Sequence, residues 1–227
     1  MILKNIAAVN LFFFTVVFSM PLFAQQVYTE NGLAVIDNSA MSVKSRKSPQ
    51  EVADSKTTNG ILKRHEKEKK TLFASNPDVN AKVSPKFAVS PQNVGASGQA
   101  CTRPDVTTYY WEEAAGWDVS VNNSETAPVA PTPTGCAAYG GLNGDEQGKW
   151  RMPTFREAML MVALKSKLEA QPNFTAFSTN DSYWTATESY LSNCFIVDFS
   201  YGRSATTAKS RSSNSHPNHY LRCVKDL

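Results

Sequence analysis

A capping box and a helical repeat of apolar residues predict a helix in the second half of the chain. Thr154 and Glu157 have the spacing at which a threonine hydroxyl accepts from the third helical N–H and a glutamate reaches back to the cap. Apolar residues then recur with helical periodicity to about Ala170, and Pro172 ends the pattern. Because the apolar stripe is wide, we expect this helix to pack on more than one side inside a core.

Shorter segments rich in aromatic and β-branched residues follow the helix and predict strands. The expected strands span residues 182–188 and 194–199, a segment that follows a turn at 200–203 and runs to about 209, and residues 219–225. In the second of them, two-residue alternation puts Phe195, Val197 and Phe199 on one face. A helix followed by short antiparallel strands is typical of an α+β fold.

Residues 1–24 have the pattern of a secretory signal. Lys4 supplies a positive charge, an apolar run of about 13 residues follows, and Ala24 ends a small-residue cleavage site. The run is shorter than the roughly 20 residues that a membrane-spanning helix needs. We therefore expect export and cleavage after Ala24, which would leave a soluble chain without a membrane span.

Residues 25–100 alternate short apolar patches with polar and charged stretches, which predicts a polar, flexible arm. Two apolar patches flank Asn31-Gly32, a dipeptide that suits a two-residue hairpin turn. A lone hairpin is marginally stable, so this one needs a surface to pack against. The stretch from Ser75 to Ala100 is rich in proline, serine and glycine and has the composition of a linker. The expected folded domain therefore spans residues 101–227.

Composition limits the possible functions. The net charge of +3 is too small for a protein that binds nucleic acid through charge alone. All four cysteines lie within residues 101–227. Outside the cytoplasm such cysteines are candidate disulfides, and four of them permit three different pairings.

Few residues have the spacing of a metal or catalytic site. Gln171-Pro172-Asn173 resembles the triplet with which C-type lectins hold calcium and sugar, and Asn180-Asp181 lies downstream, but a helix-stopping proline accounts for the triplet without a ligand. His216 and His219 are three residues apart in a serine-rich flank, and no third ligand has a fitting spacing. We predict no metal, no cofactor and no enzymatic activity.

Four phrases in the domain resemble the Lcl C-terminal domain family, which is named after the end of a bacterial collagen-like adhesin. The phrases are Trp150-Arg151-Met152-Pro153-Thr154 with Glu157, Tyr183-Trp184-Thr185-Ala186-Thr187-Glu188, Val197-Asp198-Phe199 with Gly202, and Leu221-Arg222-Cys223-Val224. The resemblance implies a C-type-lectin-like fold. It also implies a protein that is exported to the cell surface, as fimbria-associated proteins of Bacteroides-type bacteria are. It also implies a disulfide between Cys136 and Cys223, which leaves Cys101 to pair with Cys194.

A second resemblance points to an enzyme. The start of the helix and the Arg222-Cys223-Val224 ending are also similar to the formylglycine-generating enzyme family, which binds copper(I) through two thiolates. In this alternative, Cys194 and Cys223 would have to be reduced and adjacent.

The favoured hypothesis is a disulfide-stapled binding module used in adhesion, recognition or a fimbrial or other surface assembly. Its loops would contact a protein or glycan partner, and no contact with nucleic acid is expected. The alternative within this class is a structural subunit without an external ligand. The loops between residues 170 and 182 and between 209 and 219 are the expected contact regions. They contain the candidate ligand-binding residues Asn173, Asn180, Asp181, Asn214 and His216.

Overall fold

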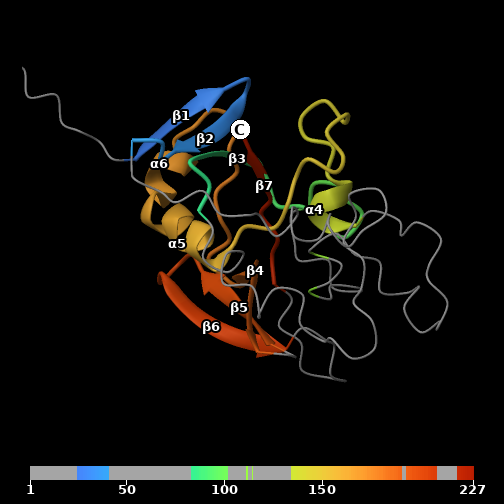
Figure 1. Cartoon of the computed structure of the whole chain (residues 1–227), viewed down its shortest axis with the longest axis vertical. Coiled ribbons are helices and arrows are strands. Elements are labelled where there is room, and N and C mark those ends of the chain that lie inside the picture. Colours follow the sequence, from blue (N-terminus) through green and yellow to red (C-terminus); the bar gives the residue numbers. More distant parts are fainter. Residues whose placement is uncertain are drawn as a thin grey trace, which may run out of the picture.

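The structure is a computed structural model that describes residues 25–40, 83–101, 111, 114, 134–190, 193–208 and 219–227 (Figure 1). Its strands are β1 (Gln26–Glu30), β2 (Leu33–Asp37), β3 (Lys86–Val89), β4 (Ser182–Tyr190), β5 (Asn193–Asp198), β6 (Arg203–Ala208) and β7 (Val224–Asp226). Its helices are α4 (Gly135–Ala138), α5 (Phe155–Ala163) and α6 (Lys165–Glu169). These helices and antiparallel sheets confirm the predicted α+β class. The signal segment lies outside the described residues.

One antiparallel sheet has the strand order β1-β2-β3-β7 and joins the two ends of the described chain. The predicted hairpin at Asn31-Gly32 is confirmed, because both residues have positive φ, 50° and 80°, and β1 pairs with β2 across them. The surface that this hairpin needed is β3, which pairs with β2 on one side and with β7 on the other.

The expected boundary at residue 100 therefore needs correction. The sequence predicts a flexible arm that includes residues 26–37 and 86–89. In the structure these residues form strands, and Ile36, Phe87 and Val89 are fully buried. Each apolar patch is too short to bury itself, but together the patches form the centre of a sheet that the last strand of the chain completes. Residues 41–82 of the expected arm lie outside the described residues.

The second sheet, β4-β5-β6, confirms the strands expected after the helix. Val197 and Phe199 lie in one buried cluster, as the alternation predicted, and Phe195 is half-buried against Phe155. The opposite face of β5 is also buried, because Cys194 and Ile196 belong to a second cluster. The terminal strand departs from the expectation, since β7 joins the first sheet.

The predicted helix is present as two short helices. The capping box is formed: Thr154 Oγ1 accepts from Glu157 N at 3.2 Å, and Thr154 N donates to Glu157 Oε2 at 2.9 Å. Leu164, with φ −103° and ψ 10°, separates α5 from α6. Both helices lie between the two sheets (Figure 1), and buried residues of α5 and α6 share one cluster with residues of both sheets. Within the described residues, no helix has the length and apolarity to cross a bilayer.

Gly98 fixes the close approach of residues 95–101 to α4. A Cβ built at Gly98 would lie 2.5 Å from the Ala138 carbonyl carbon. The φ of +78° is also unfavourable for residues that carry a side chain. We expect Gly98→Ala to lower the free energy of unfolding by about 2–4 kcal/mol, since left-handed strain and overpacking add. Urea denaturation measures this change. Gly144→Ala is the matched control, because Gly144 has φ +81° but nothing within 4 Å, so only the strain of about 1–2 kcal/mol applies. Equal losses in both variants would contradict the close packing.

Candidate functional site

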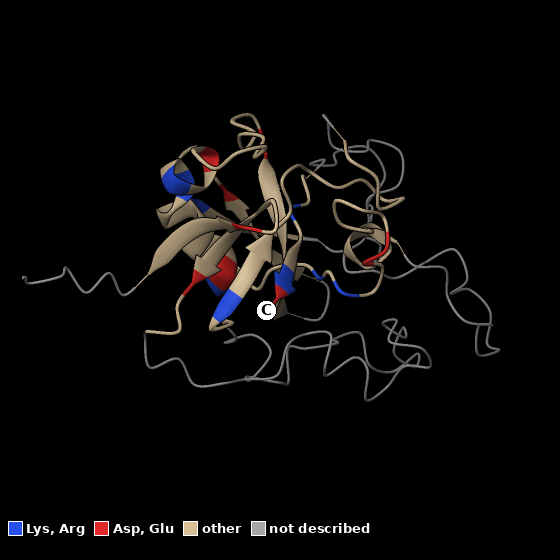
Figure 2. Ribbon diagram, turned by 90° about the horizontal axis from the view of Figure 1, so that it is seen from above, with Lys and Arg blue, Asp and Glu red and all other residues tan. Residues whose placement is uncertain are grey.

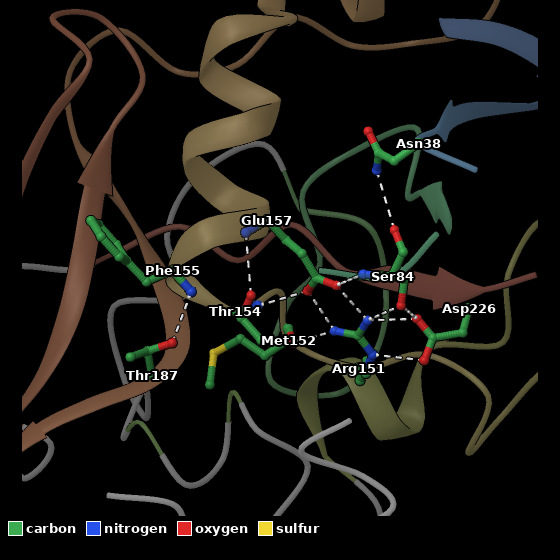
Figure 3. A network of polar contacts seen from close by, with 9 residues as sticks. All are labelled: Asn38, Ser84, Arg151, Met152, Thr154, Phe155, Glu157, Thr187 and Asp226. Carbon is green, nitrogen blue, oxygen red and sulfur yellow. Dashed lines mark hydrogen bonds and ion pairs between the residues drawn. The ribbon is translucent and has the colours of Figure 1, made fainter. Parts of the chain in front are cut away.

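A buried ion network holds the start of α5 against the first sheet (Figure 3). Arg151, 4% exposed, donates from Nη1 and Nη2 to the two carboxylate oxygens of Glu157, both at 2.8 Å. Its Nη2 also contacts Asp226 of β7 and, at 3.2 Å, the hydroxyl of Ser84. The remaining capacity of Glu157 is used by the backbone N–H groups of Ser84 and Thr154.

This network has the chemistry of a structural clamp. Burial alone would lower the pKa of Arg151, but the charges of Glu157 and Asp226 outweigh it and raise that pKa. The guanidinium therefore stays charged at neutral pH and does not act as an acid or a base. Paired charges also occur elsewhere, as between Lys225 and Glu146 and between Lys86 and Glu30, and Figure 2 shows residues of both signs intermixed over the described chain.

A second buried arginine ties the predicted contact loop to the core. Arg222 donates to the carbonyl oxygens of Ser90 at 3.1 Å and Thr175 at 2.9 Å. Its guanidinium lies over the rings of Phe174 and Phe177, at 4.8 and 4.6 Å from their centroids. Burial lowers its pKa to about 10, so it remains a cation at neutral pH. The loop after α6 is thus held firmly at its aromatic residues.

The structure places three predicted contact residues on this loop. Asn173 is exposed and has φ +63°, Asn180 is exposed, and Asp181 is half-buried before β4. Burial raises the pKa of Asp181. The other two predicted contacts, Asn214 and His216, lie outside the described residues.

The resemblance of Gln171-Pro172-Asn173 to a calcium-sugar triplet finds no geometric support. The Gln171 side chain is occupied on both sides: its Oε1 accepts from Thr29 at 2.8 Å and its Nε2 donates to the Lys167 carbonyl at 3.1 Å. The described residues also contain no group of three or more His, Cys, Asp or Glu side chains that could hold a metal ion. The triplet ends α6 and anchors it to β1.

The disulfide implied by the resemblance is present between Cys136 of α4 and Cys223, and both cysteines are fully buried. The second implied pairing needs correction, because no disulfide joins Cys101 to Cys194. The two sulfurs have different neighbours: Cys194 Sγ lies 3.9 Å from the Thr207 carbonyl oxygen of β6, whereas Cys101 lies against Gly95.

His219 is buried at the start of the last described segment. Its ring meets Trp184 edge to face at 4.6 Å, and neither ring nitrogen has a hydrogen-bond partner among the described residues. The suggested pairing with His216 cannot be placed, since His216 is not described. An unpartnered neutral imidazole in a core costs free energy, and protonating it costs more.

This burial predicts a loss of stability in mild acid. Burial lowers the pKa of His219 to about 4, whereas the unfolded chain has the ordinary value near 6.5. Between these pH values the unfolded state binds the proton and the folded state does not. The contribution of His219 to the free energy of unfolding is therefore fully present above about pH 6.5 and is lost as the pH falls toward 4. We expect a loss of up to about 3 kcal/mol, measured by urea denaturation at several pH values. His219→Phe should remove most of this slope, and a parallel slope in the variant would contradict the assignment.

Two surface hollows in the described part of the chain bear on where a ligand could bind. The first, of about 120 Å³, is lined by buried Leu33, Val35 and Ala88 and edged by the Lys225–Glu146 ion pair. The second, of about 150 Å³, lies between residues 92–100 and the loop after α4. Three glutamines line the second hollow, and two of them fall in the segment predicted as linker. The sequence alone does not mark these glutamines as candidate binding residues, because exposed glutamines are common in linkers.

Comparison with known families decides the classification. The model of the Lcl C-terminal domain matches residues 88–225, which is more than half of the chain. The chain belongs to the Lcl C-terminal domain family. No curated protein matches the sequence.

The family range contains the disulfide, α5 and Arg151, while β1 and β2 precede it. In this member, β1 and β2 lie outside the matched range and complete a sheet whose other two strands, β3 and β7, overlap that range. The family and its disulfide fit a surface-associated domain.

Proposed function

We propose that this Lcl C-terminal domain protein is exported and acts at the bacterial cell surface as a non-enzymatic recognition module. Its partner is a protein or a glycan, and its setting is an adhesin, a fimbria or another surface assembly. The C-type-lectin-like fold that the resemblance implies belongs to this proposal. A rigid core displays irregular loops, whose side chains make the contacts.

The Cys136–Cys223 disulfide is the observation that carries the proposal. It closes a separation of 87 residues inside the core, and stable structural disulfides are rare in the reducing cytosol. It therefore supports the interpretation of residues 1–24 as a secretory signal. The loop of Asn173 and Asn180 supports display, because its backbone is anchored by Arg222 while these two side chains are exposed.

The enzymatic alternative loses its proposed metal ligands. It required Cys194 and Cys223 together as thiolates, but Cys223 is bonded to Cys136. No other observation favours that alternative.

Locating the protein on intact cells of its host tests the proposal. We expect an antibody against residues 101–227 to label unpermeabilised cells, and the mature chain to begin at Gln25 by N-terminal sequencing. Deleting residues 2–24 should abolish labelling while the protein is still made. An uncleaved chain in the cytoplasm with all cysteines reduced would overturn the proposal.

A further test separates recognition from a purely structural role. Purified mature protein is applied to arrays of glycans and of extracellular-matrix proteins, and incorporation into surface filaments is followed in parallel. Binding supports recognition. Filament incorporation without any binding would leave the structural subunit as the function.

A further inference from the structure

The hollow next to the disulfide helix has fixed walls. One wall is the segment containing Gln92 and Gln99, and the other is the end of α4 and the loop that follows it, seen side by side in Figure 1. The two walls are joined where Gly135 N donates to the Ala96 carbonyl at 2.7 Å. The hollow is therefore held open by backbone contacts that already exist without a ligand.

Three further contacts make this shape rigid. Cys136 anchors α4 to the last segment of the chain through the disulfide. The loop after α4 folds back so that Gly148 N donates to the Ala137 carbonyl at 2.8 Å and Glu146 N to the Gly140 carbonyl at 3.0 Å. A site of fixed shape loses little conformational entropy when it binds.

The described residues that line this hollow are polar or small, and none of them is charged. The other hollow differs sharply, since Glu30, Glu146 and Lys225 line it. Burial raises the pKa of Tyr139 to about 12, so its hydroxyl is neutral as well. A charged ligand would find no counter-ion among the described residues of this lining.

Three glutamine side chains supply the recognition chemistry. None of the side chains of Gln92, Gln99 and Gln147 is hydrogen-bonded to another described residue. Each primary amide offers two donor hydrogens and one acceptor oxygen. Such groups match ligands whose own groups both donate and accept, and sugar hydroxyls have this property.

We infer that this hollow binds one neutral sugar residue of a glycan through the amides of Gln92, Gln99 and Gln147. The inference rests on the proposed recognition function and names the ligand class. A sugar fits better than a peptide because the hollow, about 150 Å³, is compact, whereas an extended peptide needs a groove. Tyr139 is only 4% exposed, so little ring surface is available for stacking. Affinity for a single sugar is therefore weak, on the order of 1 mM, and many copies on a surface raise it through avidity.

Saturation-transfer NMR on the mature full-length chain tests the inference. The probes are the methyl glycosides of glucose, galactose, mannose and N-acetylglucosamine. We expect at least one to give a transfer signal that persists in about 0.5 M salt, which screens charge. The signal should also persist in EDTA, which removes calcium. Gln99→Ala/Gln147→Ala should reduce that signal at least about fivefold, because two of the three amides that hydrogen-bond the sugar are lost. Both residues are exposed, so the variant should melt like the parent.

Gln26→Ala is the matched control, since Gln26 is an exposed glutamine on β1. Its signal should equal that of the parent. No signal from any neutral glycoside, equal signals in the double variant, or binding of charged glycans alone would overturn the inference. Those results leave the proposed function standing if the protein still labels intact cells, so the two failures are distinguishable.

Discussion

Replacing Glu157 with alanine should lower the free energy of unfolding by about 3–5 kcal/mol. The substitution leaves Arg151 buried with one carboxylate gone, and it also removes the acceptor for the Ser84 and Thr154 N–H groups. A buried charge that loses its partner keeps the full cost of desolvation. Urea denaturation at neutral pH measures the loss.

A surface pair provides the control for this prediction. Glu30 and Lys86 form an ion pair with side chains 39% and 29% exposed, so water screens the pair and Glu30→Ala should cost far less than Glu157→Ala. Asp226→Ala should fall between the two variants, because Asp226 contacts Arg151 but is 39% exposed. If Glu157→Ala cost no more than Glu30→Ala, the network would not hold the sheet to the helix.

Removing the Cys136–Cys223 disulfide should cost about 4–5 kcal/mol. On the chain-entropy model, opening a loop with a separation of 87 residues returns that much entropy to the unfolded chain. The double variant Cys136→Ala/Cys223→Ala tests this without reductant, by urea denaturation or by the shift of the melting temperature. Since a domain has a total stability of about 5–15 kcal/mol, this loss is a large fraction of the total.

Reductant distinguishes the loss of the bridge from the loss of packing. Dithiothreitol should destabilise the parent by a similar amount and leave the double variant unchanged. Cys101→Ala serves as the control, because Cys101 is outside the bridge and only partly buried. A parent that melts identically with and without reductant, after reduction is verified by mass spectrometry, would contradict the prediction.

Local signals predicted the elements that depend on neighbours in sequence. The Thr154–Glu157 capping box, the alternation in β5 and the Asn31-Gly32 turn all require residues within a few positions of one another. Each is confirmed where it was expected. The Cys136–Cys223 bridge joins distant residues, and it was predicted only through resemblance to a family.

Long-range pairing explains what was missed. Nothing near Leu33–Asp37 or Lys86–Val89 reveals that β7 completes their sheet, because strand pairing depends on partners far away in the chain. Asp226 and Ser84 likewise become hydrogen-bond partners of Arg151 only when the chain folds. The glutamines of the neutral hollow converge from two segments about 50 residues apart, so their cluster had no signature along the chain.

By itself, the amino-acid sequence determined the helix start, the local strands, the hairpin turn and the family of the domain, since each depends on short phrases of residue types. Only the tertiary structure decided that the N-terminal patches are core strands, that Cys101 and Cys194 are not bridged to each other, and that an uncharged hollow lies beside the disulfide. The physical reason is that burial and proximity arise from pairing across the whole chain, and a polar segment with short apolar patches becomes ordered once distant strands cover it.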